Sequence, residues 1–101
     1  PEEDMGIRVA QSLSYPMVSR YMALDDQYYM VKIEIKGSMI GLRLQDFMRP
    51  EQRIRAILHQ RNDSINYSLD PQFVLQQGDI VVIAGYLVDL RRFSQHFVDD
   101  V

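Results

Sequence analysis

The sequence contains few of the residues that hold metals or carry out covalent chemistry. Its 101 residues include no cysteine and only two histidines, His59 and His96. Without cysteine the chain forms neither a disulfide framework nor a thiolate metal site. A zinc site needs three or four ligands at short spacings, and the two histidines lie on different predicted elements. We therefore predict no metal site and interpret both histidines as packing or surface residues.

Two other deficits exclude classes of partner. No apolar run approaches the ~18 residues that a membrane-spanning helix requires, so we expect no direct membrane insertion. The formal net charge is -3, whereas nucleic-acid binding needs a clustered basic surface. The acidic start Pro1-Glu2-Glu3-Asp4 has no signal-peptide character and suggests a fragment whose natural neighbours are missing.

A catalytic apparatus is also missing. Ser38 lies between Gly37 and Gly41, but the spacing is not G-x-S-x-G, and no histidine is close in sequence to act as its base. The carboxylate pairs at 25–26 and 99–100 are adjacent in sequence, which does not place two carboxylates across a cleft. The sequence thus predicts that the protein is not an enzyme and that this fragment holds no cofactor. A small hydrolase would need polar groups converging beside Ser38 or His59.

What the sequence does contain is a hydrophobic share of 47% and a charged share of 25%, the composition of one globular domain. Residues 2–14 predict a helix, which Pro16 interrupts, and Met17 to Leu24 predict a second helical stretch that ends at Asp25-Asp26. From Tyr28 the hydrophobic period becomes two, which predicts a half-buried strand. Its inward residues are Tyr29, Val31, Ile33 and Ile35.

The remaining predicted elements are, in order, a helix over 41–48, a strand over 53–59, its hairpin partner over 64–69, a strand over 80–84 and a helix over 86–97. The strand 80–84 is continuously apolar, which predicts a central place in the sheet with both faces covered. The inner stripe of the last helix is Leu87, Leu90, Phe93 and Phe97. This order predicts an α+β fold, with a small, largely antiparallel sheet of about four to five strands and short helices. We divide the chain into a helical connector over 1–27 and a domain over 28–101.

Two features stand out on this scaffold. Asp79 follows Gly78 at the turn into the apolar strand, where a carboxylate accepts local backbone N–H bonds, and we interpret it as part of the turn. The N-terminal part is richer in aromatic and methionine side chains than about thirty residues can bury on their own. Either they contribute to the core of the domain or they pack against another chain or a missing domain. Interface cores are enriched in both residue types, so we favour an interface, and the candidates are Tyr15, Met17, Tyr21 and Met22.

From Tyr28 onward the sequence resembles the C-terminal lobe of the RCK family (regulators of K⁺ conductance), also called the TrkA C-terminal domain. The matching segments are Ile33 to Gly41, Ile54 to Arg61 and the run from Gln77 to Gly85, together with Leu44, Phe47, Asp70, Leu75, Leu90 and Phe93. The upstream segments Gly6 to Leu13 and Pro16 to Val18 are similar to the helix and crossover that leave the family's Rossmann-like N-lobe. The order and spacing of these short motifs carry the resemblance.

The resemblance implies a regulatory role. In this family the lobe dimerises and is tethered to a nucleotide-binding N-lobe that gates a K⁺ channel or transporter. Some members bind a small effector, such as cyclic di-AMP, between two C-lobes. For this chain the resemblance implies a cytoplasmic, homodimeric regulatory domain of a potassium or other cation transport system. Its partners would be the missing nucleotide-binding N-lobe and a membrane transport subunit or segment.

The identity of any nucleotide effector is open at this point. The resemblance places Arg49-Pro50-Glu51 where the ligand-contacting loop of such family members lies. If an anionic effector binds there, the basic groups nearest in sequence are Arg43, Arg49, Arg53 and Arg55. Guanidinium groups suit phosphate oxygens. The alternative is a purely structural oligomerisation domain of a membrane permease or antiporter, with no effector.

Overall fold

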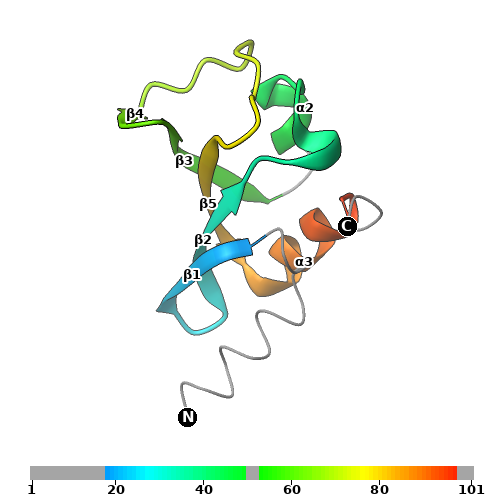
Figure 1. Ribbon diagram of the computed structural model, residues 1–101. Coiled ribbons are helices and arrows are strands. Elements are labelled where there is room, and N and C mark those ends of the chain that lie inside the picture. The colour runs from blue at the N-terminus through cyan, green and yellow to red at the C-terminus, as the bar shows by residue number, and fades with distance from the viewer. Residues whose placement is uncertain (1–17, 50–52, 98–101) are drawn as a thin grey trace.

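The described part of the chain forms an antiparallel sheet, and the two α-helices in that part lie on one side of it (Figure 1). The computed structural model describes residues 18–49 and 53–97. Its elements in chain order are β1 (Val18–Asp25), β2 (Tyr28–Glu34), a 3-10 helix η1 (Gly37–Met39), α2 (Leu44–Met48), β3 (Ile54–Arg61), β4 (Ser64–Asn66), β5 (Ile80–Tyr86) and α3 (Leu87–Gln95). The five strands form one sheet in the order β1-β2-β5-β3-β4, and every neighbouring pair is antiparallel. The predicted α+β fold with a largely antiparallel sheet is confirmed.

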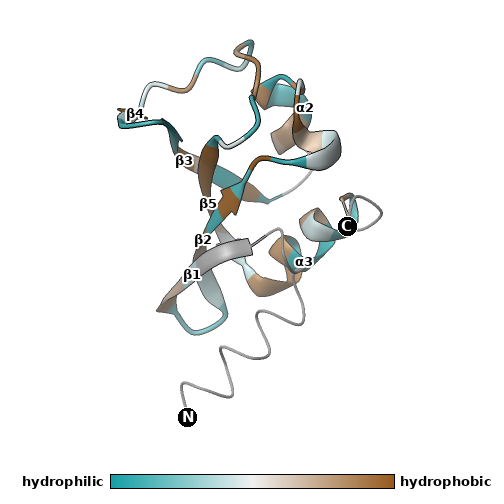
Figure 2. Ribbon diagram, viewed as in Figure 1, coloured by the Kyte–Doolittle hydropathy of each residue, from teal (hydrophilic) through white to brown (hydrophobic). Residues whose placement is uncertain are grey.

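β5 lies at the centre of the sheet, between β2 and β3. Val81 and Ile83 face the helices and are fully buried, whereas Val82 and Ala84 on the other face are exposed by only 6% and 3%. Both faces are therefore covered, as the continuous apolar run predicted. The alternation predicted for β2 is also confirmed, because its inward side chains are at most 2% exposed. Figure 2 shows the most hydrophobic ribbon in β5 and part of β2, and hydrophilic ribbon at the turn after β1.

α3 covers the sheet with the predicted stripe. Leu87, Leu90 and Phe93 are buried, and Phe97 continues the stripe in the turn after the helix. The Phe93 ring lies edge-on to the ring of Phe47 from α2, with 5.2 Å between centroids. Such an aromatic pair contributes about 0.5–1.5 kcal/mol beyond its burial. These rings hold α2 beside α3, although the two helices are far apart in sequence.

The helical prediction for Met17 to Leu24 is wrong, because residues 18–25 form the strand β1. β1 pairs with β2 along its length through a tight turn at 26–27, in which Gln27 has a φ of 62°. Methionine, alanine and leucine favour a helix locally, but pairing with a neighbouring strand outweighs that preference. The Asp25-Asp26 break is the start of a hairpin turn and not the end of a helix.

The other boundaries shift by a few residues. α2 begins at Leu44 and not at 41, because Gly41 has a φ of 88°, a left-handed conformation that a helix does not contain. β4 has only three residues, shorter than the predicted hairpin partner over 64–69. The predicted helix over 2–14 and the interface candidates Tyr15 and Met17 lie outside the described residues. Within those residues, no helix is long and apolar enough to cross a bilayer.

Gly85 marks a close approach of β5 and β3. It lies opposite Ile54 in the register of these two strands. A Cβ atom at position 85 would lie 2.8 Å from Cγ2 of Ile54 and 3.3 Å from the carbonyl oxygen of Arg53. Any side chain larger than that of glycine at position 85 would therefore collide with Ile54 in its present position.

Candidate functional site

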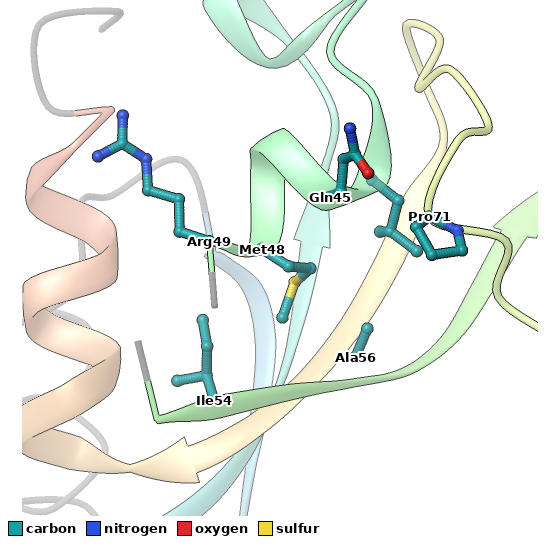
Figure 3. A pocket seen from close by; sticks show the side chains of 7 residues that line it. Gln45, Met48, Arg49, Ile54, Ala56 and Pro71 are labelled. Carbon is teal, nitrogen blue, oxygen red and sulfur yellow. The ribbon is translucent and has the colours of Figure 1, made fainter. Parts of the chain in front are cut away.

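A groove of about 370 Å³ opens between α2 and β3, within the range of small-molecule sites. The residues that line it are Leu44, Gln45, Met48 and Arg49 at α2, Ile54 and Ala56 of β3, and Pro71 of the loop before β5. Figure 3 shows the α2 side chains and the β3 side chains on opposite sides of the opening, with Pro71 at one end. The walls are mostly apolar, and Gln45 and Arg49 are their polar members.

The α2 wall is held against the loop over residues 70–76. The backbone N–H of Gln45 donates to the carbonyl of Pro71, and that of Leu44 donates to the carbonyl of Phe73, both at 3.0 Å. Amides in the first turn of a helix have no acceptor within the helix, so the loop supplies acceptors that α2 lacks. The loop thus forms one end of the groove and also orients the helix that makes its wall.

The β3 wall ends at an irregularity in the strand. Ile54 and Ala56 share one face, as alternate residues of a strand do. The register with β5 shifts between Ala56 and Leu58, which is a β-bulge. After the shift His59 lies opposite Val81, on the face that carries Ile54 and Ala56. The bulge therefore ends the apolar wall and turns a histidine into the interior.

The four arginines predicted as anion-binding groups lie in different places. Arg49 lines the groove at the end of α2, where its φ is 40°. Arg53 is exposed immediately before β3. Arg55 is exposed on the face of β3 opposite to the groove residues, in register with Ala84 of β5. Of these three, only Arg49 is part of the groove wall.

Arg43 reaches the groove indirectly. Its Nη1 donates to Oε1 of Gln72 at 3.3 Å, and Nε2 of Gln72 donates to Oε1 of Gln45 at 3.1 Å. Gln45 is itself a groove residue. Arg43 therefore lies at the rim and is joined to the wall by a chain of two exposed hydrogen bonds.

A buried polar cluster lies beside the same loop, centred on Asp79, which is 2% exposed. Arg61 binds both carboxylate oxygens, with Nε 2.9 Å from Oδ1 and Nη2 2.8 Å from Oδ2. Oδ2 also accepts from the backbone N–H of Gln76 and from Nε2 of His59, each at 2.9 Å. The predicted turn role of Asp79 accounts for the Gln76 bond alone. The two side-chain partners were not predicted.

The contacts of Asp79 keep it ionised. Burial raises the pKa of the Asp79 carboxyl, because desolvation disfavours the charged form. The hydrogen bonds from Arg61, Gln76 and His59, together with the charge of Arg61, outweigh burial and lower the pKa from 3.8 to about 2. The hydrogen bond to Asp79 in turn raises the pKa of Arg61. The pair is therefore an ion pair throughout the neutral range.

Both ring nitrogens of His59 are engaged. An ionised carboxylate only accepts hydrogen bonds, so Nε2 of His59 carries a proton and donates to Asp79. Nδ2 of Asn66 lies 3.1 Å from Nδ1 of the same ring, within hydrogen-bond distance. The ring of Phe73 lies against the imidazole, with 4.7 Å between centroids. At 2% exposure His59 is the packing residue that the sequence indicated, and it also joins β3 and β4 to the loop.

The remaining candidates are exposed. Tyr21 and Met22, the described interface candidates, are 39% and 51% exposed on β1 at the edge of the sheet. His96 is exposed at the end of α3. In the part of the chain that the structure describes, no three His, Cys, Asp or Glu side chains are grouped to hold a metal ion.

Sequence reasoning missed the groove because its walls come from three separate segments. The alternation of Ile54 and Ala56 was visible, but nothing local indicated that Met48 and Pro71 would face them. Arg61 was visible only as the last residue of a matching strand. The partner of a buried carboxylate depends on tertiary structure, so no local signal assigned Arg61 to Asp79.

No family model matches the sequence. Among curated proteins the chain is similar to Ktr system potassium uptake protein A of Bacillus subtilis (strain 168), with 30% identity over 95 residues. It is also similar to Ktr system potassium uptake protein C of the same organism, with 27% identity over 96 residues. The matches cover 93% and 94% of this chain but 43% of each relative. The chain thus spans less than half the length of the curated relatives that it matches.

A solved structure is also similar. It is the regulator of conductance of K⁺ (RCK) C domain of the potassium transport protein KtrA, in complex with cyclic diadenosine monophosphate. The TM-score is 0.63 at 28% sequence identity, over 70% of this chain and 85% of the solved domain. Sequence and fold therefore point to the same kind of domain.

Proposed function

We propose that this chain is an RCK C-terminal domain and that it is the effector-sensing regulatory part of a potassium transport system. The groove between α2 and β3 is the observation that carries this proposal. A similar domain has been solved with cyclic di-AMP, and the groove is a site of ligand size with apolar walls and a few polar groups. The domain would act on transport without catalysis, by binding the effector more tightly in one of two arrangements.

The chemistry of the groove suits part of a cyclic dinucleotide. Adenine offers flat apolar faces, which match Leu44, Met48 and Ile54. The phosphodiester is anionic and pairs well with guanidinium groups. Arg49 lines the groove, so we expect it to pair with such a phosphate before the other predicted arginines, and Arg43 at the rim is the next candidate. We propose smaller roles for Arg53 and Arg55, which lie outside the groove wall.

Calorimetry with cyclic di-AMP tests this assignment. Arg49→Ala removes one charge-assisted hydrogen bond, so we expect the dissociation constant to rise about tenfold. The matched control is Arg92→Ala, which removes an exposed arginine of α3 that is not part of the groove wall and should leave the constant within about twofold. Equal effects of the two substitutions, or no binding by the unchanged protein, would contradict the proposal that cyclic di-AMP binds in the groove.

We also propose that the domain works as a homodimer. Cyclic di-AMP is two-fold symmetric, so a symmetric pair of domains would present the same groups to both of its halves. β1 offers a second surface for self-association, because it is an edge strand with exposed Tyr21 and Met22, and edge strands pair readily with other chains. Tyr15 and Met17 are proposed members of the same interface.

Analytical ultracentrifugation measures the dimer directly. Met22→Lys places a charge on the edge strand, and we expect the dimer dissociation constant to rise at least tenfold. Tyr67→Lys is the control, since Tyr67 is 72% exposed and lies away from β1. If both variants dimerise like the unchanged protein, β1 is not the interface.

The rest of the assembly is proposed from the family. Residues 1–27 would link the domain over 28–101 to a nucleotide-binding N-lobe, and β1 would be the point where that link joins the sheet. The N-lobe would in turn contact a membrane transport subunit or segment, with the regulatory parts in the cytoplasm.

The alternative is a purely structural oligomerisation domain without an effector. A thermal-shift screen separates the two, because a ligand at about 100 times its dissociation constant stabilises the folded state by about 2.7 kcal/mol. Nucleotides and cations that all leave the melting temperature unchanged would favour the structural role.

A further inference from the structure

The Asp79 cluster and the groove share one loop. Residues 70–76 present Pro71 to the groove and the Phe73 ring to His59. The carbonyl of Val74 accepts from Nη2 of Arg61 at 3.0 Å. The backbone N–H of Gln76 donates to Asp79. The loop is therefore tied to the cluster along its length, through Phe73, Val74 and Gln76.

The ties continue into α2. The carbonyls of Pro71 and Phe73 accept from the amides of Gln45 and Leu44, and those two residues line the groove. An unbroken path of contacts thus runs from the Asp79 carboxylate through the loop to the first turn of α2. Apart from the ring contact of Phe73, the contacts on this path are hydrogen bonds, which fix the relative positions of the groups that they join.

Other features of the cluster favour a positioning role over simple packing. A buried ion pair is a poor source of net stability, because desolvation offsets most of its attraction. Its strength is geometric, since the bidentate fork of Arg61 accepts only one arrangement of the carboxylate. Arg61 is also 35% exposed at its side chain, so the cluster reaches the surface.

We propose that Asp79 is a positioning residue for the effector groove. Acting through Arg61 and His59, it holds the 70–76 loop in the position in which Pro71 closes one end of the groove and α2 forms the wall opposite β3. The proposal rests on the proposed function, because the groove is the effector site named above. By reciprocity, a ligand that fills the groove also makes the cluster more rigid.

The test uses the full chain and two readouts. The first is the hydrogen-exchange rate of the Leu44 and Gln45 amides by NMR, which reports the bonds between α2 and the loop without any ligand. The second is the dissociation constant for cyclic di-AMP. The variants are Asp79→Asn and Arg61→Gln, and Arg61→Lys keeps the charge but loses the fork. Val31→Ala in the fully buried part of β2 is the control that lowers stability at a position outside both the loop and the Asp79 cluster.

We expect Asp79→Asn and Arg61→Gln each to speed exchange at Leu44 and Gln45 about tenfold beyond Val31→Ala, after matching for overall stability in urea. Each should also raise the dissociation constant for cyclic di-AMP about tenfold. The double variant should raise it no further than the more severe single variant does, because the two residues act as one unit. Arg61→Lys should fall between the unchanged protein and Arg61→Gln. If Asp79→Asn does not fold, the two Arg61 variants decide the question alone.

Two outcomes separate this proposal from the proposed function. If the network variants match Val31→Ala in both readouts, the cluster only stabilises the fold and the positioning role is overturned. If the unchanged protein does not bind cyclic di-AMP, the effector assignment fails, and the exchange rates at Leu44 and Gln45 alone support or overturn the positioning role.

Discussion

Around α3 the interior consists mainly of aromatic and aliphatic side chains, with Asp89 and Ser94 as buried polar members of the helix. Beside the 70–76 loop it contains polar groups arranged around one carboxylate. In the first region the rings of Phe47, Phe93 and Phe97 lie with centroids 5.2 to 5.7 Å apart. Attraction between such groups has little directional preference and depends on filled volume. In the second region each contact of Asp79 needs a particular donor at a particular angle. The first region chiefly supplies stability, and the second chiefly fixes the position of a loop.

The largest effect should come from the apolar region. Phe93→Ala would leave a cavity among the rings and the sheet, and we expect the free energy of unfolding to fall by about 4 kcal/mol. Urea denaturation measures it. Val88→Ala on the exposed side of the same helix should change stability by less than about 0.5 kcal/mol. A small loss at Phe93 would mean that the apolar region is not the main source of stability.

The polar region should show a smaller loss of stability. Asp79→Asn removes a charge that accepts four hydrogen bonds, and we expect unfolding to become easier by about 2 to 3 kcal/mol. The loss stays below that of Phe93→Ala because Arg61 reaches solvent on its own. Asp63→Asn in the exposed turn between β3 and β4 is the matched control. A loss no larger than that of the control would contradict the role assigned to the carboxylate.

Acid should reveal the same carboxylate without a mutation. The pKa of Asp79 is about 2 in the folded chain and 3.8 ordinarily, so folding favours its charged form. The stabilisation is complete above about pH 4 and is lost as the pH falls through 2, and it amounts to roughly 2 kcal/mol. Because other carboxyl groups titrate too, the measurement is the difference between the unchanged protein and Asp79→Asn from pH 5 to pH 2. That difference should shrink on acidification, and a constant difference would refute the ion pair.

The smallest effect should come from exposed polar contacts. Gln72→Ala removes hydrogen bonds to Arg43 and Gln45 that face solvent, and we expect a change of less than about 0.5 kcal/mol in unfolding free energy. The comparison with Asp79→Asn separates buried from exposed hydrogen bonds around one loop. A loss approaching that of Asp79→Asn would show that burial does not distinguish the two sets.

The sequence predicted best where one period decides the structure. The alternation in β2 and the stripe of α3 each fix which side chains are buried, so those elements were predicted correctly. The prediction for Met17 to Leu24 was wrong because the local preference of this segment is helical, whereas its pairing with the strand that follows the turn makes it extended. The predictions were thus correct where buried residues recur at a regular spacing in the sequence. They were wrong where pairing with a neighbouring strand overrides the local helix propensity.

The site was less predictable than the fold. His59 faces the interior only because the β3 register shifts after Ala56, and a bulge has no reliable local signature. The arginines were chosen by closeness in sequence, yet the groove takes in Arg49 and leaves Arg55 on the opposite face. Pro71 joins the groove through a loop whose path depends on Asp79.

Gly85 influences the shape of the groove although it is not one of the residues that line it. The Ile54 side chain occupies its place in the wall because nothing projects from β5 behind it, where a Cβ atom would lie 2.8 Å away. A single methyl group at that position would displace the Ile54 side chain and so change the shape of the groove wall. The preference of such a domain for one effector over another could therefore change through a residue that touches neither, and two relatives with identical groove residues could still select different ligands.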